Sequence, residues 1–211
     1  MGYHESLTEG RNAVLEAFRS GKTVDRLFVL DGCQDGPVKT ILREAKKQDT
    51  MVQYVKKERL DQLSETKNHQ GVIAYCAACE YAEVSDILEN AKKKGEAPFI
   101  VLPDGIEDPH NLGAIIRTAN QAGAHGVIIP KRRAVGLTAT VARTSAGAVN
   151  YTPVAKVTNL VTVMEDLKKE GMWFVCADMD GEEMYSLNLK GPIGLVIGNE
   201  GEGVSRLVKE H

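Results

Sequence analysis

Four short, continuously apolar runs in the second half of the chain constrain its fold more than any other feature. Each run has four or five residues, and polar or helix-forming sequence separates it from the next. Strands that are apolar throughout are buried on both faces, as in a parallel sheet covered by helices. The pattern therefore predicts a doubly wound α/β domain. The runs are residues 99–102, 126–129, 173–177 and 193–197.

A similar alternation fills the first eighty residues. There, three short apolar strands alternate with amphipathic helices, which indicates a small α/β unit with a partly parallel sheet. We expect Thr8 to cap its first helix and its second helix to follow Pro37. The predicted strands are 26–30, 51–55 and 71–76, and the predicted helices of the larger domain are about 112–122, 137–144 and 159–169.

A linker with a short helix, residues 81–97, separates the two predicted units, 1–80 and 98–211. Ser85 can cap the helix, and the three lysines at 92–94 suit the negative end of its dipole. The helix end thus accounts for these lysines, which indicate no phosphate site.

Composition places the chain among globular proteins. Of its 211 residues, 26 % are charged and 43 % hydrophobic, and no apolar run reaches the roughly 18 residues of a membrane helix. The start lacks the basic and apolar regions of a signal peptide. The four cysteines form no disulfide framework, and the spacing of Cys76 and Cys79 lacks the second pair that a zinc site needs. We therefore expect a cytoplasmic protein without a metal.

Charge is distributed unevenly, although the net charge is only −3. Residues 109–164 contain no Asp or Glu, whereas residues 165–211 carry ten acids and five bases. In the first unit, by contrast, acids and bases balance. This asymmetry predicts that one face of the second unit meets an anionic partner. The bases of the acid-free stretch are Arg117, Lys131, Arg132, Arg133, Arg143 and Lys156.

Two segments at predicted strand ends have the residue types of a ligand site, because ligands of doubly wound sheets bind beyond the carboxyl ends of the strands. In the first segment, 104–113, turn residues lead into a helix that begins near Asn111, and Arg117 lies less than two turns further on. Free N–H groups at a helix start and a guanidinium group both bind anions. On spacing alone, Asn111 could equally be a helix cap and Arg117 a surface residue.

The second segment, 198–203, has three glycines in six residues. Its spacing, G-x-x-G-x-G, differs from the dinucleotide-binding G-x-G-x-x-G, and no Walker A motif occurs in the chain. The two acids of this segment suit a ribose or a cationic centre better than a polyphosphate. A third segment, 143–148, has small and hydroxyl residues that could line a pocket or form a tight turn.

Together these segments resemble the SpoU/TrmH-type RNA methyltransferases of the SPOUT superfamily, over nearly the whole chain. Residues 108–119 resemble the first motif of that family, 197–203 the second motif, and 144–148 the segment between them. Residues 10–14 and 69–72 resemble the substrate-binding domain that precedes the catalytic domain in the ribosomal RNA branch.

The resemblance is closest to the group that methylates guanosine in bacterial 23S ribosomal RNA. It implies transfer of a methyl group from S-adenosylmethionine to a ribose 2′-hydroxyl by a homodimer, without a metal. It also implies a parallel-sheet catalytic domain with a C-terminal trefoil knot, preceded by an α/β domain that binds the RNA substrate. The alternatives are an enzyme acting on transfer RNA or on an adenosine of ribosomal RNA, and a catalytically silent RNA-binding protein.

The resemblance also implies roles for individual residues. Asn111 and Arg117 would act at the ribose and its neighbouring phosphate, and Glu200 would orient one of them. We expect Arg117 to clamp phosphate and to stabilise the developing oxyanion, because a guanidinium with a pKa above roughly 12 is a poor base. The implied cofactor-binding residues are Thr144, Ser145, Gly147, Ile197, Gly198 and Gly201, and the implied RNA-binding residues are Arg11, His69, Gln70, Lys131, Arg132, Arg133 and Arg143.

Members of the family have a third motif with a Ser-Leu-Asn core, some tens of residues after the second. The sequence ends at His211, eight residues after Gly203. The resemblance implies that the third motif completes the cofactor pocket and part of the dimer contact. We expect weak cofactor binding and weak dimerisation without it.

Overall fold

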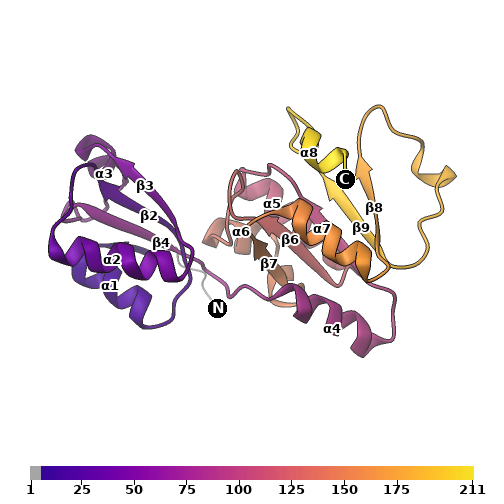
Figure 1. Ribbon diagram of the computed structural model, residues 1–211, viewed down its shortest axis with the longest axis horizontal. Helices are drawn as coiled ribbons and strands as arrows, with labels where there is room; N and C mark the ends of the chain where they lie inside the picture. Colours follow the sequence, from indigo (N-terminus) through magenta and orange to yellow (C-terminus); the bar gives the residue numbers. More distant parts are fainter. Residues whose placement is uncertain (1–5) are drawn as a thin grey trace. The chain divides into compact units, whose positions relative to one another are not determined.

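The computed structural model describes residues 6–211, which form two compact units that divide between Glu80 and Tyr81 (Figure 1). Residues 1–5, where we expect no signal peptide, lie outside the described part of the chain. Among the described helices, none has the length and apolar character that crossing a membrane requires.

The first unit is a four-stranded mixed sheet with helices on both faces. Its strand order is β1-β4-β2-β3, in which β2 and β3 are parallel and β4 runs antiparallel to β1 and β2. Helices α1 and α2 pack on one face and α3 on the other, so the unit has two apolar clusters. The elements are β1 (Ser6–Glu9), α1 (Arg11–Arg19), β2 (Val24–Leu30), α2 (Gly36–Lys47), β3 (Met51–Val55), α3 (Lys57–Leu63) and β4 (Val72–Cys76).

The start of α1 contradicts the prediction that Thr8 caps it. Thr8 lies inside β1, an unpredicted strand, and is paired with Ala74 of β4. The helix begins at Arg11, directly after Gly10, whose φ of 88° only glycine adopts readily. Gly10, with its positive φ, is thus the single residue between the end of β1 and the start of α1.

A single carboxylate organises the loop that follows α3. Glu9, at the end of β1, accepts hydrogen bonds from the hydroxyls of Ser64 and Thr66. The backbone N–H groups of Glu65 and Thr66 donate to the same carboxylate, at 2.8 and 3.2 Å. Partial burial opposes ionisation of this group, but the hydrogen bonds outweigh it and hold the pKa of Glu9 below its ordinary value.

We expect Glu9→Gln to destabilise the first unit at neutral pH. Because the folded-state pKa of Glu9 is lowered, its ionised form stabilises the fold above the unfolded value near 4.5, and this contribution is lost as the pH falls through the folded value. Urea unfolding followed by circular dichroism, between about pH 3 and pH 7, measures the effect. Glu65→Gln is the control, since the Glu65 side chain is exposed. If the wild-type chain and Glu9→Gln lost stability in parallel over this range, the role of Glu9 would be wrong.

The second unit is a five-stranded sheet that is entirely parallel, as the apolar runs predict, and its strand order is β7-β6-β5-β9-β8. The predicted burial on both faces is wrong for β8, which lies at the edge of the sheet and has no buried residue. Helices α4, α7 and α8 contribute to the apolar cluster on one face, and α5 and α6 pack together on the other. Strand β7 is the one strand of this sheet that was not predicted. The elements are α4 (Val84–Lys94), β5 (Phe99–Pro103), α5 (Pro109–Gln121), β6 (Gly126–Pro130), α6 (Ala139–Thr144), β7 (Val154–Val157), α7 (Leu160–Lys169), β8 (Trp173–Ala177), β9 (Ile193–Ile197) and α8 (Arg206–Lys209).

The predicted linker, residues 81–97, packs within the second unit. Its helix, α4, has Glu83 at the cap position, so Ser85 lies inside the helix and does not cap it. Ile87 is fully buried and packs over Gly126 of β6, where an added Cβ would lie 2.5 Å from the Ile87 side chain. The helix therefore forms part of the core of this unit.

Candidate active site

The carboxyl ends of β5 and β9 are neighbours, and the loops that leave them form the candidate site (Figure 1). The two strands pair in parallel along their whole length, up to Pro103 and Ile197. Beyond that pair, the N–H of Asp104 donates to the carbonyl oxygen of Ile197 at 2.8 Å. The loop into α5 and the loop into α8 therefore start side by side, although the sequence separates them widely.

Asn199 ties these two loops together. Its Nδ2 donates to the carbonyl oxygen of Gly105 at 3.0 Å. Its Oδ1 accepts from the N–H groups of Gly201 and Glu202, at 2.8 and 3.3 Å, and its backbone pairs with Gly203 in both directions. Asn199 was absent from the predicted site. The signal that could have found it is an Asn in a glycine-rich turn, where its side chain commonly bonds nearby backbone.

The two predicted cofactor-binding glycines of this loop differ in what surrounds them. An added Cβ at Gly198 would lie 2.1 Å from the carbonyl carbon of Gly203 and 2.2 Å from the nitrogen of Val204. At Gly201 it would meet only the Asn199 Oδ1, at 3.3 Å. The loop itself therefore requires glycine at position 198, whereas Gly201 is exposed and donates its N–H to the Asn199 side chain.

Asn111 and Glu200, two of the predicted catalytic residues, meet across the loops. The Nδ2 of Asn111 donates to the Oε1 of Glu200 at 3.0 Å. Helix α5 begins at Pro109, because Asp108 caps it. Asn111, where the helix was predicted to begin, is therefore the third residue of the helix. Glu200 was expected to orient either Asn111 or Arg117, and the structure brings it to Asn111.

Arg117 lies further along α5 and is exposed. It follows Asn111 by six residues, which is about 9 Å along the helix axis and about 120° around it. Among residues 6–211 the guanidinium has no acidic partner. The Arg117 guanidinium is therefore available to bind an anion from outside the chain. Asn111 and Arg117 can act on the same ligand, as predicted, only if that ligand is long enough to contact both residues.

The predicted role of Thr144 and Ser145 in cofactor binding is not supported by the contacts of their hydroxyls. Ser145 is fully buried, and its hydroxyl donates to the carbonyl oxygen of Ala142 at 2.8 Å. Thr144 bonds carbonyl oxygens of its own helix and packs on Gly113 of α5, where an added Cβ would lie 1.9 Å from the Thr144 Oγ1. These residues join α6 to α5. Gly147, with φ of 86° and open space around it, remains able to approach a ligand.

Three of the predicted RNA-binding bases of the second unit follow β6 at the same edge of the sheet. Lys131 continues from the strand, and Arg132 and Arg133 are exposed in the loop after it. Arg143 is exposed on α6. Because all five strands are parallel, the loop after β6 lies on the same side as the loops that carry Asn111 and Glu200.

In the first unit, the predicted RNA-binding residues hold two loops together. The Nε of Arg11 donates to the carbonyl oxygen of Gln70 at 3.1 Å, and its Nη2 pairs with Asp35 at 2.5 Å. His69 is only 7 % exposed, and its Nδ1 accepts a backbone N–H at 3.0 Å while its Nε2 faces Asp61. His69 therefore supports the loop from inside, in contrast to the predicted RNA contact. Gln70 is the most exposed of the three.

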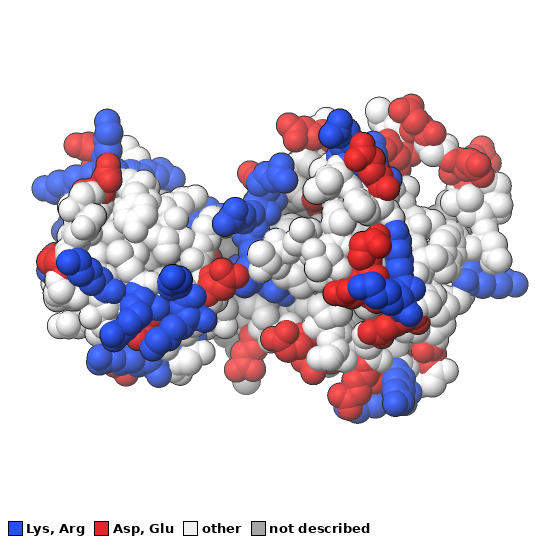
Figure 2. All heavy atoms as spheres, viewed as in Figure 1, with Lys and Arg blue, Asp and Glu red and all other residues white. Residues whose placement is uncertain are grey.

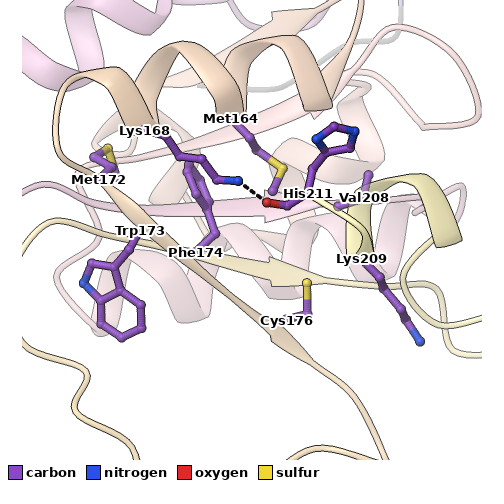
Figure 3. Close-up of a pocket in the computed structure, with 9 residues that line it drawn as sticks. All are labelled: Met164, Lys168, Met172, Trp173, Phe174, Cys176, Val208, Lys209 and His211. Carbon is purple, nitrogen blue, oxygen red and sulfur yellow. Dashed lines mark hydrogen bonds between the residues drawn. The ribbon is translucent and has the colours of Figure 1, made fainter.

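A cavity of about 580 Å³ lies between α7, β8 and α8, and none of the predicted site residues lines it (Figure 3). Its walls include Met164, Met172 and Phe174, and at its rim Lys168 donates to the carbonyl oxygen of His211. Burial raises the pKa of the Cys176 thiol in this cavity, so this cysteine is not an activated nucleophile. Within residues 6–211, no group of His, Cys, Asp or Glu side chains is placed to hold a metal ion.

Comparison with known proteins matches each of the two units to a family model. Residues 97–211 match the model of the SpoU rRNA Methylase family, and residues 7–82 match the model for RNA 2′-O ribose methyltransferase substrate binding. The chain is 48 % identical over 203 residues to YacO of Bacillus subtilis, which bears the description TrmH family tRNA/rRNA methyltransferase, and the match covers 95 % of this chain and 81 % of YacO. A protein of Staphylococcus haemolyticus with the same family description is 45 % identical over 202 residues, with the same coverage.

Solved structures share the fold. The SpoU methyltransferase AviRb of Streptomyces viridochromogenes, in complex with AdoMet, has a TM-score of 0.55 at 23 % identity, and the match covers 98 % of this chain and 77 % of that one. An AdoMet-bound rRNA methyltransferase of Sinorhizobium meliloti has a TM-score of 0.53 at 22 % identity, over 98 % and 75 % of the two chains. The fold of the chain is thus the SPOUT fold. The chain belongs to the SpoU/TrmH family of RNA methyltransferases.

Proposed function

We propose that the chain transfers a methyl group from S-adenosylmethionine to a ribose 2′-hydroxyl of ribosomal RNA, and that the target is a guanosine of 23S ribosomal RNA. The observation that carries the proposal is the contact between Asn111 and Glu200, because it joins the two family motifs in one site. The match of residues 7–82 to a substrate-binding model supports an RNA partner. The AdoMet complexes of similar folds support the cofactor. We further propose that the protein acts as a homodimer in the cytoplasm.

The loop after β9 has groups that fit this cofactor, which supplies an electrophilic methyl group on a sulfonium when it is bound. The exposed carboxylates of Glu200 and Glu202 suit ribose hydroxyls and a positively charged sulfur. Gly201 is exposed, and Asn199 holds the loop in one conformation by accepting the Gly201 N–H. We expect the backbone of Ile197 and Gly201, together with the Glu202 carboxylate, to hold the cofactor.

The orientation of Asn111 suggests how the ribose is placed. The Asn111 Nδ2 donates to Glu200, and no residue of the described part of the chain donates to the Asn111 Oδ1. This oxygen can therefore accept a hydrogen bond, for which a ribose 2′-hydroxyl is a suitable donor. The exposed guanidinium of Arg117 clamps the neighbouring phosphate and stabilises negative charge that develops on the attacking oxygen. The hydroxyl proton leaves to the phosphate or to water. In this scheme the protein contributes mainly by positioning the hydroxyl in line with the methyl group.

A transfer assay with tritiated S-adenosylmethionine tests the proposal. Ribosomal RNA from a strain that lacks the gene should accept label in the 23S fraction, at one guanosine that a 2′-O-methyl map identifies, and Asn111→Ala should abolish the labelling. Label in transfer RNA or at an adenosine would establish the alternative substrates instead. Tight RNA binding without any transfer would show a silent RNA-binding protein.

A further inference from the structure

Helix α2 of the first unit carries four exposed bases on its outer side, which we call the α2 basic face: Lys39, Arg43, Lys46 and Lys47. Their spacing of four, three and one places them on one side of a helix. The opposite side, with Val38, Ile41 and Ala45, is buried in the core. Figure 2 shows Lys and Arg gathered over α1 and α2 of this unit.

The stability of the helix explains two of these four bases, Lys46 and Lys47, but not the other two. Lys46 and Lys47 lie in the last turn, where a positive charge suits the helix dipole, and Lys47 pairs with Glu44 at 2.9 Å. Lys39 lies in the first turn, where the dipole disfavours a positive charge, and no acid among the described residues pairs with it. Arg43 reaches Glu44 only at 3.6 Å and is 69 % exposed. Within residues 6–211, Lys39 thus has no acidic partner, and Arg43 has only the long contact with Glu44.

The balanced net charge of the first unit does not reveal this face, because acids of the unit that bond to other groups offset its bases in the count. Glu9 accepts hydrogen bonds from the loop after α3, and Asp35 pairs with Arg11. Within α2 itself Glu44 is the one acid, and its side chain is 22 % exposed. The surface that α2 presents is therefore positive although the whole unit is not.

We propose that the α2 basic face contacts the phosphate backbone of the RNA that this unit binds, an inference that rests on the proposed function. From Lys39 to Lys47 the helix rises about 12 Å, a length over which a nucleic-acid strand presents several phosphates. The first turn of the face lies near the Arg11–Asp35 pair, because Asp35 caps α2. Contacts of its bases with phosphates would add affinity without reading nucleobases. The match of residues 7–82 to an RNA substrate-binding model favours RNA over an acidic protein or a membrane.

A pair of matched double variants of the full chain tests the proposal. Lys39→Gln with Arg43→Gln removes two charges from α2, and Lys57→Gln with Arg59→Gln removes one Lys and one Arg from α3, on the opposite face of the sheet. Gln has nearly the same helix propensity as both residues, and circular dichroism verifies that each variant is folded. The affinity for a fluorescein-labelled RNA hairpin is measured by anisotropy between about 50 and 200 mM KCl.

The α2 variant is expected to bind the hairpin at least about tenfold more weakly at low salt, and its slope of log affinity against log salt should be shallower by about 1.4 to 1.8. The α3 variant should retain the wild-type slope. Equal effects of the two variants, or a wild-type slope for the α2 variant, would overturn the inference while leaving the proposed function standing. A wild-type chain that binds no RNA would overturn both. Loss of binding to phosphatidylglycerol vesicles, with RNA binding unchanged, would assign the face to a membrane and overturn it as well.

Discussion

Replacing Arg117 with alanine is expected to slow methyl transfer to ribosomal RNA by at least about 100-fold, which corresponds to about 2.7 kcal/mol of transition-state stabilisation. Arg117 is the one Lys or Arg of α5, is exposed, and has no acidic partner among the described residues. Its guanidinium can therefore bind a phosphate and the developing oxyanion without first breaking an ion pair. Single-turnover transfer of tritium from the cofactor to the RNA measures the loss.

Two further variants make this test specific. Arg117→Lys retains the charge but loses the planar fork that binds phosphate through two hydrogen bonds, so it should fail as well. Arg206→Ala removes an exposed arginine of α8 that pairs with Glu210, and it should leave the rate unchanged. An Arg117→Ala protein that keeps more than about a tenth of the wild-type rate, a loss below roughly 1.4 kcal/mol, would contradict the assignment.

Gly198→Ala is expected to destabilise the second unit by about 2 to 4 kcal/mol, whereas Gly201→Ala should cost less than about 1 kcal/mol. The Cβ at position 198 would overlap backbone atoms of Gly203 and Val204, which no side-chain rotation can relieve. The loop would have to open and give up the two backbone hydrogen bonds between Asn199 and Gly203. Gly201 faces only the end of the Asn199 side chain, which can move.

Urea unfolding followed by tryptophan fluorescence measures this difference, because the single tryptophan, Trp173, lies in β8 of the second unit. Calorimetric titration with S-adenosylmethionine provides a second readout, in which Gly198→Ala should bind less cofactor than Gly201→Ala. Equal stability of the two variants would show that the loop conformation does not depend on glycine at position 198.

The sheet of the second unit was predictable because its strands carry their signature locally. Four of its five strands are short apolar runs. Burial between two helix layers explains that composition for β5, β6 and β9, whereas β8 lies at the edge of the sheet and has no buried residue. Strand β7 escaped prediction because its sequence, Val-Ala-Lys-Val, is short and contains a lysine. Strand β1 escaped for a similar reason: its polar residues are compatible with a helix cap, and only pairing with β4 made them a strand.

The sequence placed Asn111 and Glu200 in the candidate site, but it did not predict the contact between them. Asn111 and Glu200 stand in recognisable motifs, yet they are 89 residues apart, and they meet only because β9 pairs beside β5 in the sheet. The same strand order brought Asn199 to Gly105. Ser145, in contrast, had a suitable hydroxyl in a suitable place, and the packing of α6 on α5 buried it.

Side-chain pattern alone thus predicted four strands of the parallel sheet, the small α/β unit that precedes them, and the motifs of the family. These properties depend on side-chain type and short spacing. Only the fold shows which loops lie at the same end of the sheet. It also shows that the Ser145 hydroxyl and the His69 imidazole are buried, and that exposed bases lie together on α2 although the charge of the first unit is balanced. Those properties depend on partners distant in the chain, since a hydrogen bond or ion pair forms only between groups that the fold brings within about 3 Å.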